Sequence, residues 1–270
     1  MSERILLFVP GFNCEKQIAR VLETLSSEVM RYLTEVIIVN NRSSDHTEAV
    51  VQAFAQSHPD LPLTLLRNNE NYGLGGSHKV AFAYAIDKKF DYVIVLHGDD
   101  QGSILDLLPV LKSGDYRNYD CCLGGRFQSG SRLQGYSRFR TFGNHVYNGL
   151  FSLALGRRIY DLGSGLNLYR VSMLTSGFYQ KFPDNLTFNY CMILGLDYFR
   201  QKALFFPISW REEDQVSNVK MTSQALKVLK MLFQYVMNKQ EFMKRELRDT
   251  IHKEYQAQVV PANSKAVIAP

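Results

Sequence analysis

The fold is decided by the stretch Val93-Ile94-Val95-Leu96-His97-Gly98-Asp99-Asp100-Gln101, in which an apolar run ends abruptly at two carboxylates. A short apolar run bounded by polar residues predicts a buried strand, so Asp99 and Asp100 are expected where that strand leaves the sheet. Ligands of open α/β sheets bind at the carboxyl ends of strands. Carboxylate oxygens in such a place suit Mg²⁺ or Mn²⁺ held together with substrate phosphates. The alternative is a polar turn in which an Asp caps the next helix.

The residues before this stretch alternate between strand and helix patterns. We expect strands at 5–9, 36–39 and 63–66, and between them helices with apolar residues at helical spacing, such as Ile18, Val21 and Leu22. This alternation predicts an α/β fold with a mainly parallel sheet and helices on both faces. Polar or glycine residues follow each strand, so we expect the loops to converge on one edge of the sheet and to form the site there.

The second half of the chain is less regular, and no change in composition demands a second domain. We expect one domain over residues 1–221, an amphipathic helical segment over 222–256 and a flexible tail over 257–270. A loop rich in Gly, Ser and Arg is expected at 127–136, where it could close over a phosphate-bearing acceptor. The basic, amphipathic helix suits a membrane interface, and packing on the domain or in a homo-oligomer is the alternative.

The composition is that of an ordinary soluble protein, with 46% hydrophobic and 21% charged residues in 270. The net charge of +5 suits anionic ligands or a membrane surface and is too weak to indicate nucleic acid. No signal peptide is visible, and no stretch approaches the roughly 18 apolar residues that span a bilayer. We therefore expect a cytoplasmic location, with peripheral contact at the inner membrane face left open.

Six short motifs in this order resemble glycosyltransferase family 2 with the A-type fold, and within it the dolichyl-phosphate mannose synthase and polyprenyl-phosphate glycosyltransferase branch. They cover roughly residues 4–235, so the resemblance implies a single A-type glycosyltransferase domain. The motifs lie at 9–15, 39–45, 71–76, 96–101, 161–170 and 207–220.

The resemblance implies a site for a nucleoside-diphosphate sugar, with Asp99 as the ligand of Mg²⁺ or Mn²⁺. The residues that it implies for substrate binding are Pro10, Phe12, Asn13, Glu15, Asn40, Asn41, Ser43, Asn71, Gly73, Gly75, His97, Asp100 and Gln101. Lys79, next to the glycine loop, is expected to reach a phosphate, and a solvated helix lysine is the alternative.

Two positions depart from the family pattern. Asn40 and Asn41 stand where the family usually has Asp, and an amide still accepts a hydrogen bond but adds a donor, so base recognition is expected to change. His97 occupies the first position of the usual Asp-x-Asp. Asp99 is therefore the metal ligand we expect, with Asp100 as its neighbour.

The chemistry of sugar transfer agrees with these roles. The leaving group is a nucleoside diphosphate, whose charge a divalent cation neutralises as a Lewis acid. Arg211 and Lys220 add fixed positive charge, with a solvated surface loop as the alternative. Asp161 is the acidic residue expected near the acceptor as base or orienting group, with a turn cap as the alternative.

The sequence thus predicts an inverting, metal-dependent glycosyltransferase, with inversion implied by the resemblance alone. The acceptor is either a polyprenyl phosphate or a glycan of a cell-surface polysaccharide. A non-catalytic nucleotide-sugar-binding subunit is the non-enzyme alternative. A sugar-1-phosphate nucleotidyltransferase would need a basic, glycine-rich loop after the first strand, which Pro10-Gly11-Phe12-Asn13 lacks.

Overall fold

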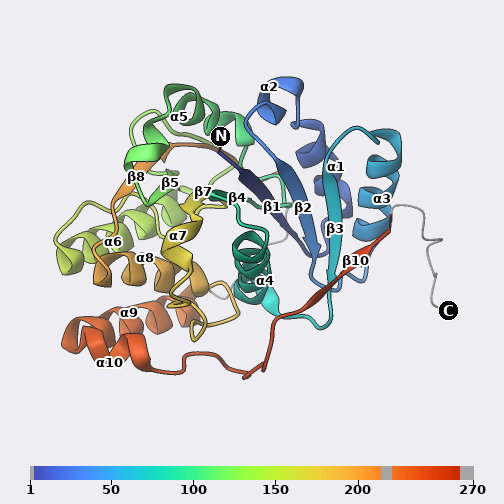
Figure 1. Cartoon of the computed structure of the whole chain (residues 1–270). Helices are drawn as coiled ribbons and strands as arrows, with labels where there is room; N and C mark the ends of the chain where they lie inside the picture. The colour runs from blue at the N-terminus through green and yellow to red at the C-terminus, as the bar shows by residue number, and fades with distance from the viewer. Residues whose placement is uncertain (1–2, 214–220, 262–270) are drawn as a thin grey trace.

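The centre of the molecule is an eight-stranded sheet in the order β10-β3-β2-β1-β4-β7-β5-β8 (Figure 1). The computed structural model describes residues 3–213 and 221–261. The strands of this sheet are β1 (Ile5–Gly11), β2 (Glu35–Asn40), β3 (Leu63–Asn68), β4 (Tyr92–Leu96), β5 (Cys121–Gly125), β7 (Leu166–Arg170), β8 (Ala203–Pro207) and β10 (Ala257–Val260). Two further short strands, β6 (Arg132–Gln134) and β9 (Ser209–Arg211), form a separate parallel pair.

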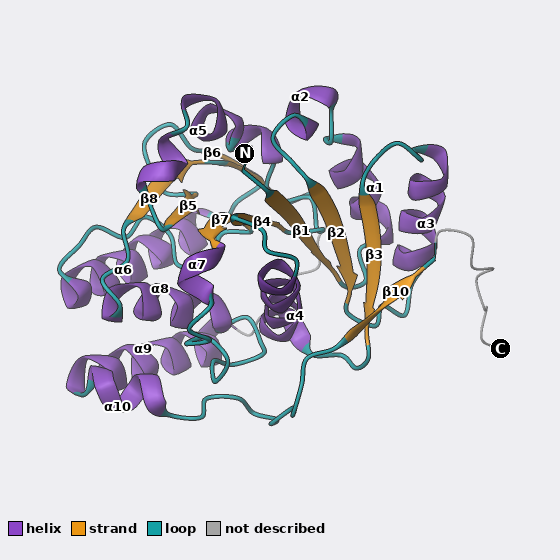
Figure 2. Ribbon diagram, viewed as in Figure 1, coloured by secondary structure: helices purple, strands orange, loops and turns teal. Residues whose placement is uncertain are grey.

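The helices cover both faces of the sheet (Figure 2). They are α1 (Glu15–Glu23), α2 (Ser27–Met30), α3 (Thr47–Ser57), α4 (Gly73–Asp87), α5 (Leu108–Ser113), α6 (Arg138–Leu155), α7 (Val171–Leu174), α8 (Phe188–Tyr198), α9 (Met221–Met237) and α10 (Lys239–Lys244). Within the described ranges, no helix combines the length and the apolar character needed to cross a membrane.

The sheet is mainly parallel, as predicted. Strand β1 runs parallel to both β2 and β4, β2 to β3, and β5 to β8, whereas β7 and β10 run antiparallel to their neighbours. Every residue of β1 is buried. A strand covered on both faces needs a continuous apolar run, and this explains why its sequence does not alternate between apolar and polar residues.

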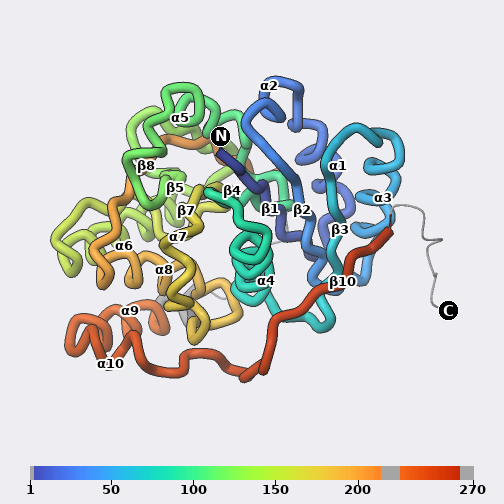
Figure 3. The backbone as a smooth tube through the Cα atoms, viewed as in Figure 1, coloured from blue at the N-terminus to red at the C-terminus, as the bar shows by residue number. Residues whose placement is uncertain are grey.

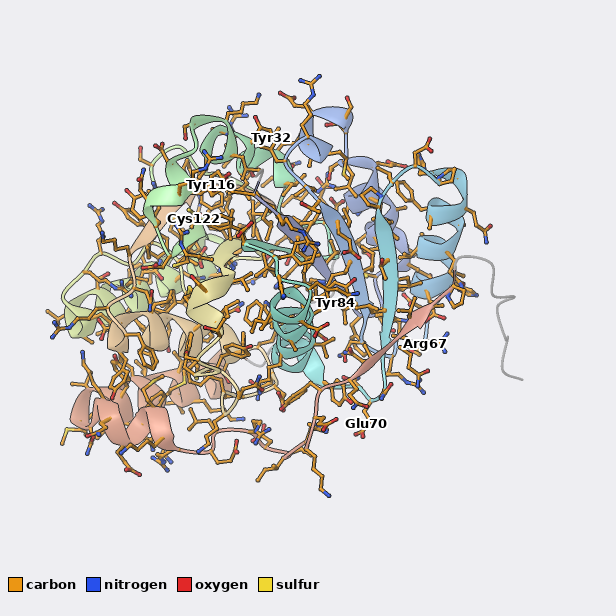
Figure 4. The ribbon with its side chains drawn as sticks, viewed as in Figure 1. Tyr32, Arg67, Glu70, Tyr84, Tyr116 and Cys122 are labelled. Carbon is orange, nitrogen blue, oxygen red and sulfur yellow. The ribbon has the colours of Figure 1, made fainter. Side chains whose placement is uncertain are left out.

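Alternate residues of the central strands supply two cores. Phe8 packs on the side of α4 and α8, while Leu7 packs on the side of α1 and α3. Both side chains are fully buried, and each such burial stabilises the fold by about 1.5–3 kcal/mol. Tyr84, labelled on α4 in Figure 4, ties this helix to β2 because its hydroxyl donates to Glu35 at 2.6 Å.

The C-terminal segment differs from the prediction of one helical segment followed by a flexible tail. The helix breaks at Asn238, whose side chain caps α10 by accepting from the backbone of Glu241 at 2.9 Å. Residues 245–256 then form an irregular strap that leads from α10 to the far edge of the sheet (Figure 3). We call this segment the strap.

The tail prediction is wrong for residues 257–260, which form strand β10. They pair antiparallel to β3, with Val260 opposite Leu65. Without them β3 would be an edge strand with unpaired backbone groups, and covering that edge satisfies those groups. Residues 262–270 lie outside the described part of the chain. The predicted loop at 127–136 likewise contains a short strand, β6.

Candidate functional site

The loops that follow β1, β2 and β4 meet at one edge of the sheet. The amide of Gly98 donates to the carbonyl of Pro10 at 3.1 Å, which joins the ends of β4 and β1. The amide of Asn13 donates to Ser43 Oγ at 3.0 Å, which joins the loops after β1 and β2. The sequence motifs that follow these strands are therefore neighbours in space.

The acidic pair at the end of β4 is split between two environments. Asp100 is buried and has a left-handed backbone conformation with φ of 60°. Its carboxylate accepts from Arg20 Nε at 2.5 Å and from the guanidinium of Arg211. Arg211 Nε also donates to the Asp100 carbonyl at 2.9 Å. Two arginines therefore hold Asp100 in place, and both contact its Oδ2.

Asp99 is partly exposed. Its Oδ1 accepts from the amide of Gln101 at 3.2 Å, and the Gln101 carbonyl accepts from the amide of Arg211 at 3.0 Å. Burial raises the pKa of Asp99 to about 6. A nearby cation would favour the charged carboxylate.

The donors present fit a divalent cation only in part. Residues 3–213 and 221–261 contain no cluster of three or more His, Cys, Asp or Glu side chains that could hold a metal ion. The described residues alone therefore offer no closed cage. A partly exposed carboxylate at a strand end matches instead the way Mg²⁺ binds, through one or two carboxylates and the oxygens of a phosphorylated substrate.

His97 lies behind the acidic pair as a neutral imidazole. Burial and the charge of Arg126 lower its pKa to about 4. Its amide donates to the carbonyl of Gly165 at 2.9 Å, and a Cβ on Gly165 would lie 2.8 Å from the ring. Among the described residues its Nε2 has no hydrogen-bond partner. The prediction of a substrate contact through His97 stays open.

Asp161 is not available as a catalytic base in this structure. Its carboxylate is buried and forms a bidentate ion pair with Arg126, at 2.6 Å to Nε and 2.7 Å to Nη2. The amides of Arg126 and Gly163 donate to the same carboxylate. The guanidinium of Arg126 also lies 4.7 Å from the centre of the Trp210 ring. Asp161 therefore positions an arginine, which we did not predict as a site residue.

Asn40 and Asn41 are buried within the protein and do not face an open site. Asn40 donates to Glu48 at 2.8 Å and accepts from the amide of Ser43 at 2.9 Å. Asn41 donates to Asn71 Oδ1 at 2.8 Å and accepts from the amide of Tyr72 at 2.9 Å. Both amides join neighbouring loops, and their predicted part in base recognition stays a prediction.

Phe12 and Glu15, on either side of Asn13, have different surroundings. Phe12 is 51% exposed beside the loop after β2, which suits an aromatic platform for a base. Glu15 accepts from the amide of His46 at 2.9 Å. Asn13 accepts from the amide of Ser44 at 2.8 Å. Glu15 and Asn13 thus shape the loop, and Phe12 is the exposed group.

The glycine loop before α4 is packed against protein. Gly73 has a φ of +70°, and a Cβ there would lie 2.4 Å from the carbonyl oxygen of Asp184. The amide of Gly75 donates to that same oxygen at 2.7 Å. Both glycines are needed because the chain around Asp184 passes so close. Their predicted role at the ligand stays a prediction.

Lys79 is neither a phosphate ligand nor a solvated lysine. Its side chain is fully buried, and its Nζ donates to Asp184 at 2.7 Å and to the Phe182 carbonyl at 2.6 Å. Tyr255 of the strap accepts from the same Nζ at 3.2 Å. The prediction for Lys79 is wrong because this cation belongs to the core. Lys220 lies outside the described residues.

No sequence pattern indicated the contacts made by Arg20 and Asp184. Arg20 is 80 residues from Asp100, and Asp184 is 105 residues from Lys79. Neither lies in a motif. Arg126 had a weak signal, because it directly precedes the basic loop at 127–136.

The fold and the acidic strand end together define an A-type glycosyltransferase domain. The model of glycosyl transferase family 2 matches residues 7–178, which is more than half of the chain. The chain belongs to glycosyltransferase family 2, and it is a glycosyltransferase.

Two relatives show how far the similarity extends. An uncharacterized protein of Methanocaldococcus jannaschii is 25% identical over 86% of this chain and 99% of its own length. The polyprenol monophosphomannose synthase of Mycolicibacterium smegmatis is 20% identical over 64% of each chain. This chain therefore spans about two thirds of that synthase.

Two solved structures share the fold. Glucosyl-3-phosphoglycerate synthase from Mycobacterium tuberculosis, in complex with uridine diphosphate, superimposes with a TM-score of 0.60 at 15% identity, over 87% of this chain and 80% of that one. A mannosyltransferase from Pyrobaculum calidifontis, in complex with GDP-mannose and Mn²⁺, gives 0.59 at 18% identity, over 88% and 65%. At these identities the likeness establishes the fold alone.

Proposed function

We propose that this protein is an inverting, metal-dependent glycosyltransferase that moves a sugar from a nucleoside-diphosphate sugar to a phosphate-bearing acceptor, a polyprenyl phosphate. The observation that carries the proposal is the split acidic pair. Arg20 and Arg211 bind the carboxylate of Asp100, and the adjacent Asp99 is partly exposed at the end of β4. The similarity to the polyprenol monophosphomannose synthase of Mycolicibacterium smegmatis supports the choice of acceptor.

Asp99 is the residue that would hold Mg²⁺ or Mn²⁺ together with the diphosphate of the donor. Bound there, the cation supplies Lewis-acid neutralisation of the leaving diphosphate. The fixed turn at Asp100 orients Asp99 without a cost in ordering at the moment of reaction. Arg211 has a side chain 38% exposed and adds positive charge beside the same carboxylates.

The pairing of Asp161 favours an acceptor that is already anionic. A sugar hydroxyl must lose its proton during transfer and needs a general base within reach. Asp161 is bound to Arg126 on both of its oxygens, so it does not offer that base. A lipid phosphate is already anionic and needs no such base. We therefore propose the lipid phosphate, and not the glycan, as the acceptor.

The test is transfer from a panel of radiolabelled UDP- and GDP-sugars to undecaprenyl or dolichyl phosphate, with Mn²⁺ or Mg²⁺. The proposal predicts label in the organic phase with at least one donor, and its loss in EDTA. Transfer to a glycan acceptor alone would overturn the lipid-phosphate assignment. Transfer that persists in EDTA would overturn the metal dependence.

A further inference from the structure

Exposed apolar side chains concentrate on two helices, α6 and α9. Of the sixteen large hydrophobic residues exposed in the described part of the chain, ten lie on these helices. Those of α6 are Phe139, Phe142, Val146, Leu150 and Leu153, and those of α9 are Leu226, Leu229, Phe233, Val236 and Met237. Monomeric soluble proteins rarely expose so many apolar side chains on neighbouring helices, and such a patch usually marks a surface that binds a partner or a membrane.

On α6 the exposed residues form one continuous stripe. They follow one another by three or four positions, from Phe139 at 76% exposure to Leu153 at 83%. A helix of 18 residues is about 27 Å long, and the stripe runs along nearly all of it. Gly143 and Gly149 have open space where a Cβ would stand. This face of α6 is therefore not packed against the rest of the described chain.

The opposite faces of the two helices are used for packing on α8. The ring of Phe151 lies 6.3 Å from that of Tyr190, and Met231 Sδ lies 3.2 Å from Cys191 Sγ. Helices α6 and α9 also contact each other, and both lie next to α8 at one end of the molecule (Figure 2). Their inner faces belong to the core, and their outer faces remain exposed.

The charges on these helices have one sign. Neither α6 nor α9 contains an Asp or Glu. Arg138, Lys227 and Lys230 are exposed on them. Apolar residues flanked by cations and without acids match the interface of a bilayer that carries anionic lipids. A second copy of the same surface would bring like charges together, which is unfavourable.

The stripe begins beside the candidate site. Arg140, in the first turn of α6, pairs with Glu212 at 2.5 Å. Glu212 directly follows Arg211 at the end of β9. A headgroup at the start of α6 therefore lies next to the strand that carries Arg211.

We propose that the outer faces of α6 and α9 form the surface with which this protein docks on an anionic lipid bilayer. This surface extends the expected membrane contact from the C-terminal helix to α6 and the edge of the site. The docking itself needs no enzymatic activity. The role of this docking in catalysis rests on the proposed function, because a lipid-phosphate acceptor would enter the site from the bilayer.

The test is co-sedimentation of the full chain with vesicles of phosphatidylcholine, with and without about 30% phosphatidylglycerol. Binding is expected only with the anionic lipid, and it should weaken at high salt. Phe142→Ser with Leu153→Ser should reduce binding at least tenfold, and Lys227→Glu with Lys230→Glu should do the same. The matched control is Leu105→Ser with Ile251→Ser, which changes exposed apolar residues elsewhere and should leave binding unchanged.

The docking proposal is overturned if the wild type stays in the supernatant, or if both α6 and α9 variants bind like the control. A wild-type dimer that dissociates in Phe142→Ser with Leu153→Ser would also overturn it, because a second copy then covers the face. Transfer to a short-chain polyprenyl phosphate in detergent is measured on the same proteins. Loss of vesicle binding with transfer intact supports the docking role, and vesicle binding without any transfer would contradict the proposed function alone.

Discussion

At the residue scale, two neighbouring carboxylates have different surroundings. Asp99 and Asp100 are adjacent, yet one is partly exposed and the other is bound by Arg20 and Arg211. The apolar run before them predicted the strand end and hence the place of the site. Which of the two carboxylates the arginines bind depends on Arg20, which reaches this point from α1. A local pattern carries no information about such a distant partner.

Lys79 tests the difference between a buried and an exposed ion pair. Lys79→Met leaves Asp184 with an uncompensated charge in a mostly buried place, so we expect a loss of about 3 kcal/mol in unfolding free energy. Lys112→Met is the control, because Lys112 and Glu28 form an exposed pair at 2.5 Å. Urea unfolding of both variants measures the difference. Equal midpoints would contradict the assignment of Lys79 to the core.

His78 makes stability depend on pH. It lies among aromatic rings, and burial and the charge of His97 lower its pKa to about 3. In the unfolded chain the imidazole of His78 binds a proton near pH 6.5, whereas in the folded chain it stays neutral at that pH. Stability is therefore complete above pH 6.5 and falls as the pH drops toward 3, by about 1.4 kcal/mol per pH unit.

Comparing urea unfolding at pH 7 and pH 5 isolates this effect. The wild type should lose about 2 kcal/mol more than His78→Phe over this interval, by the same linkage. His58→Gln changes an exposed histidine at the end of α3 and should keep the wild-type loss. If His78→Phe loses as much stability as the wild type between pH 7 and pH 5, the assignment of His78 as a neutral buried histidine is wrong.

At the scale of elements, the C-terminal strap ties two distant parts of the sequence together. Tyr255 donates to Asp184 at 2.9 Å and so joins the strap to the Lys79 pair. Glu70, labelled next to the strap in Figure 4, lies 3.7 Å from His252. The strand β10 then closes the β3 edge. Sequence patterns missed β10 because four residues are too few to show a period, and the pairing partner decides their conformation.

Adjacent valines in β10 provide a matched pair of variants. Val260 is 8% exposed and packs in the core, whereas Val259 is 65% exposed. Val260→Asp should cost about 2 kcal/mol because it buries a carboxylate without a partner, and Val259→Asp should cost little. Thermal unfolding of the two proteins checks this. Equal melting temperatures would show that β10 contributes no core packing.

At the scale of the whole molecule, the loops after β1, β2 and β4 and strand β9 meet at one edge. The sequence predicted this arrangement because alternating strands and helices leave few possible topologies. It also predicted most of the motifs that gather there. It did not predict how the loops are held together, since Asn40, Asn41 and Asp161 are used in hydrogen bonds within the protein. The same residue types can bind a ligand or hold a loop, and only the fold decides between the two.

The most direct test of the account is transfer of labelled sugar to polyprenyl phosphate by Asp99→Asn beside Asp87→Asn. Asp87 is an exposed aspartate at the end of α4, and it precedes β4 whereas Asp99 follows that strand. We expect Asp99→Asn to lower the rate at least 100-fold, equivalent to about 3 kcal/mol of transition-state stabilisation, and to keep the wild-type melting temperature. Asp87→Asn should transfer like the wild type. Wild-type rates in Asp99→Asn would contradict the proposed metal-dependent site at the end of β4.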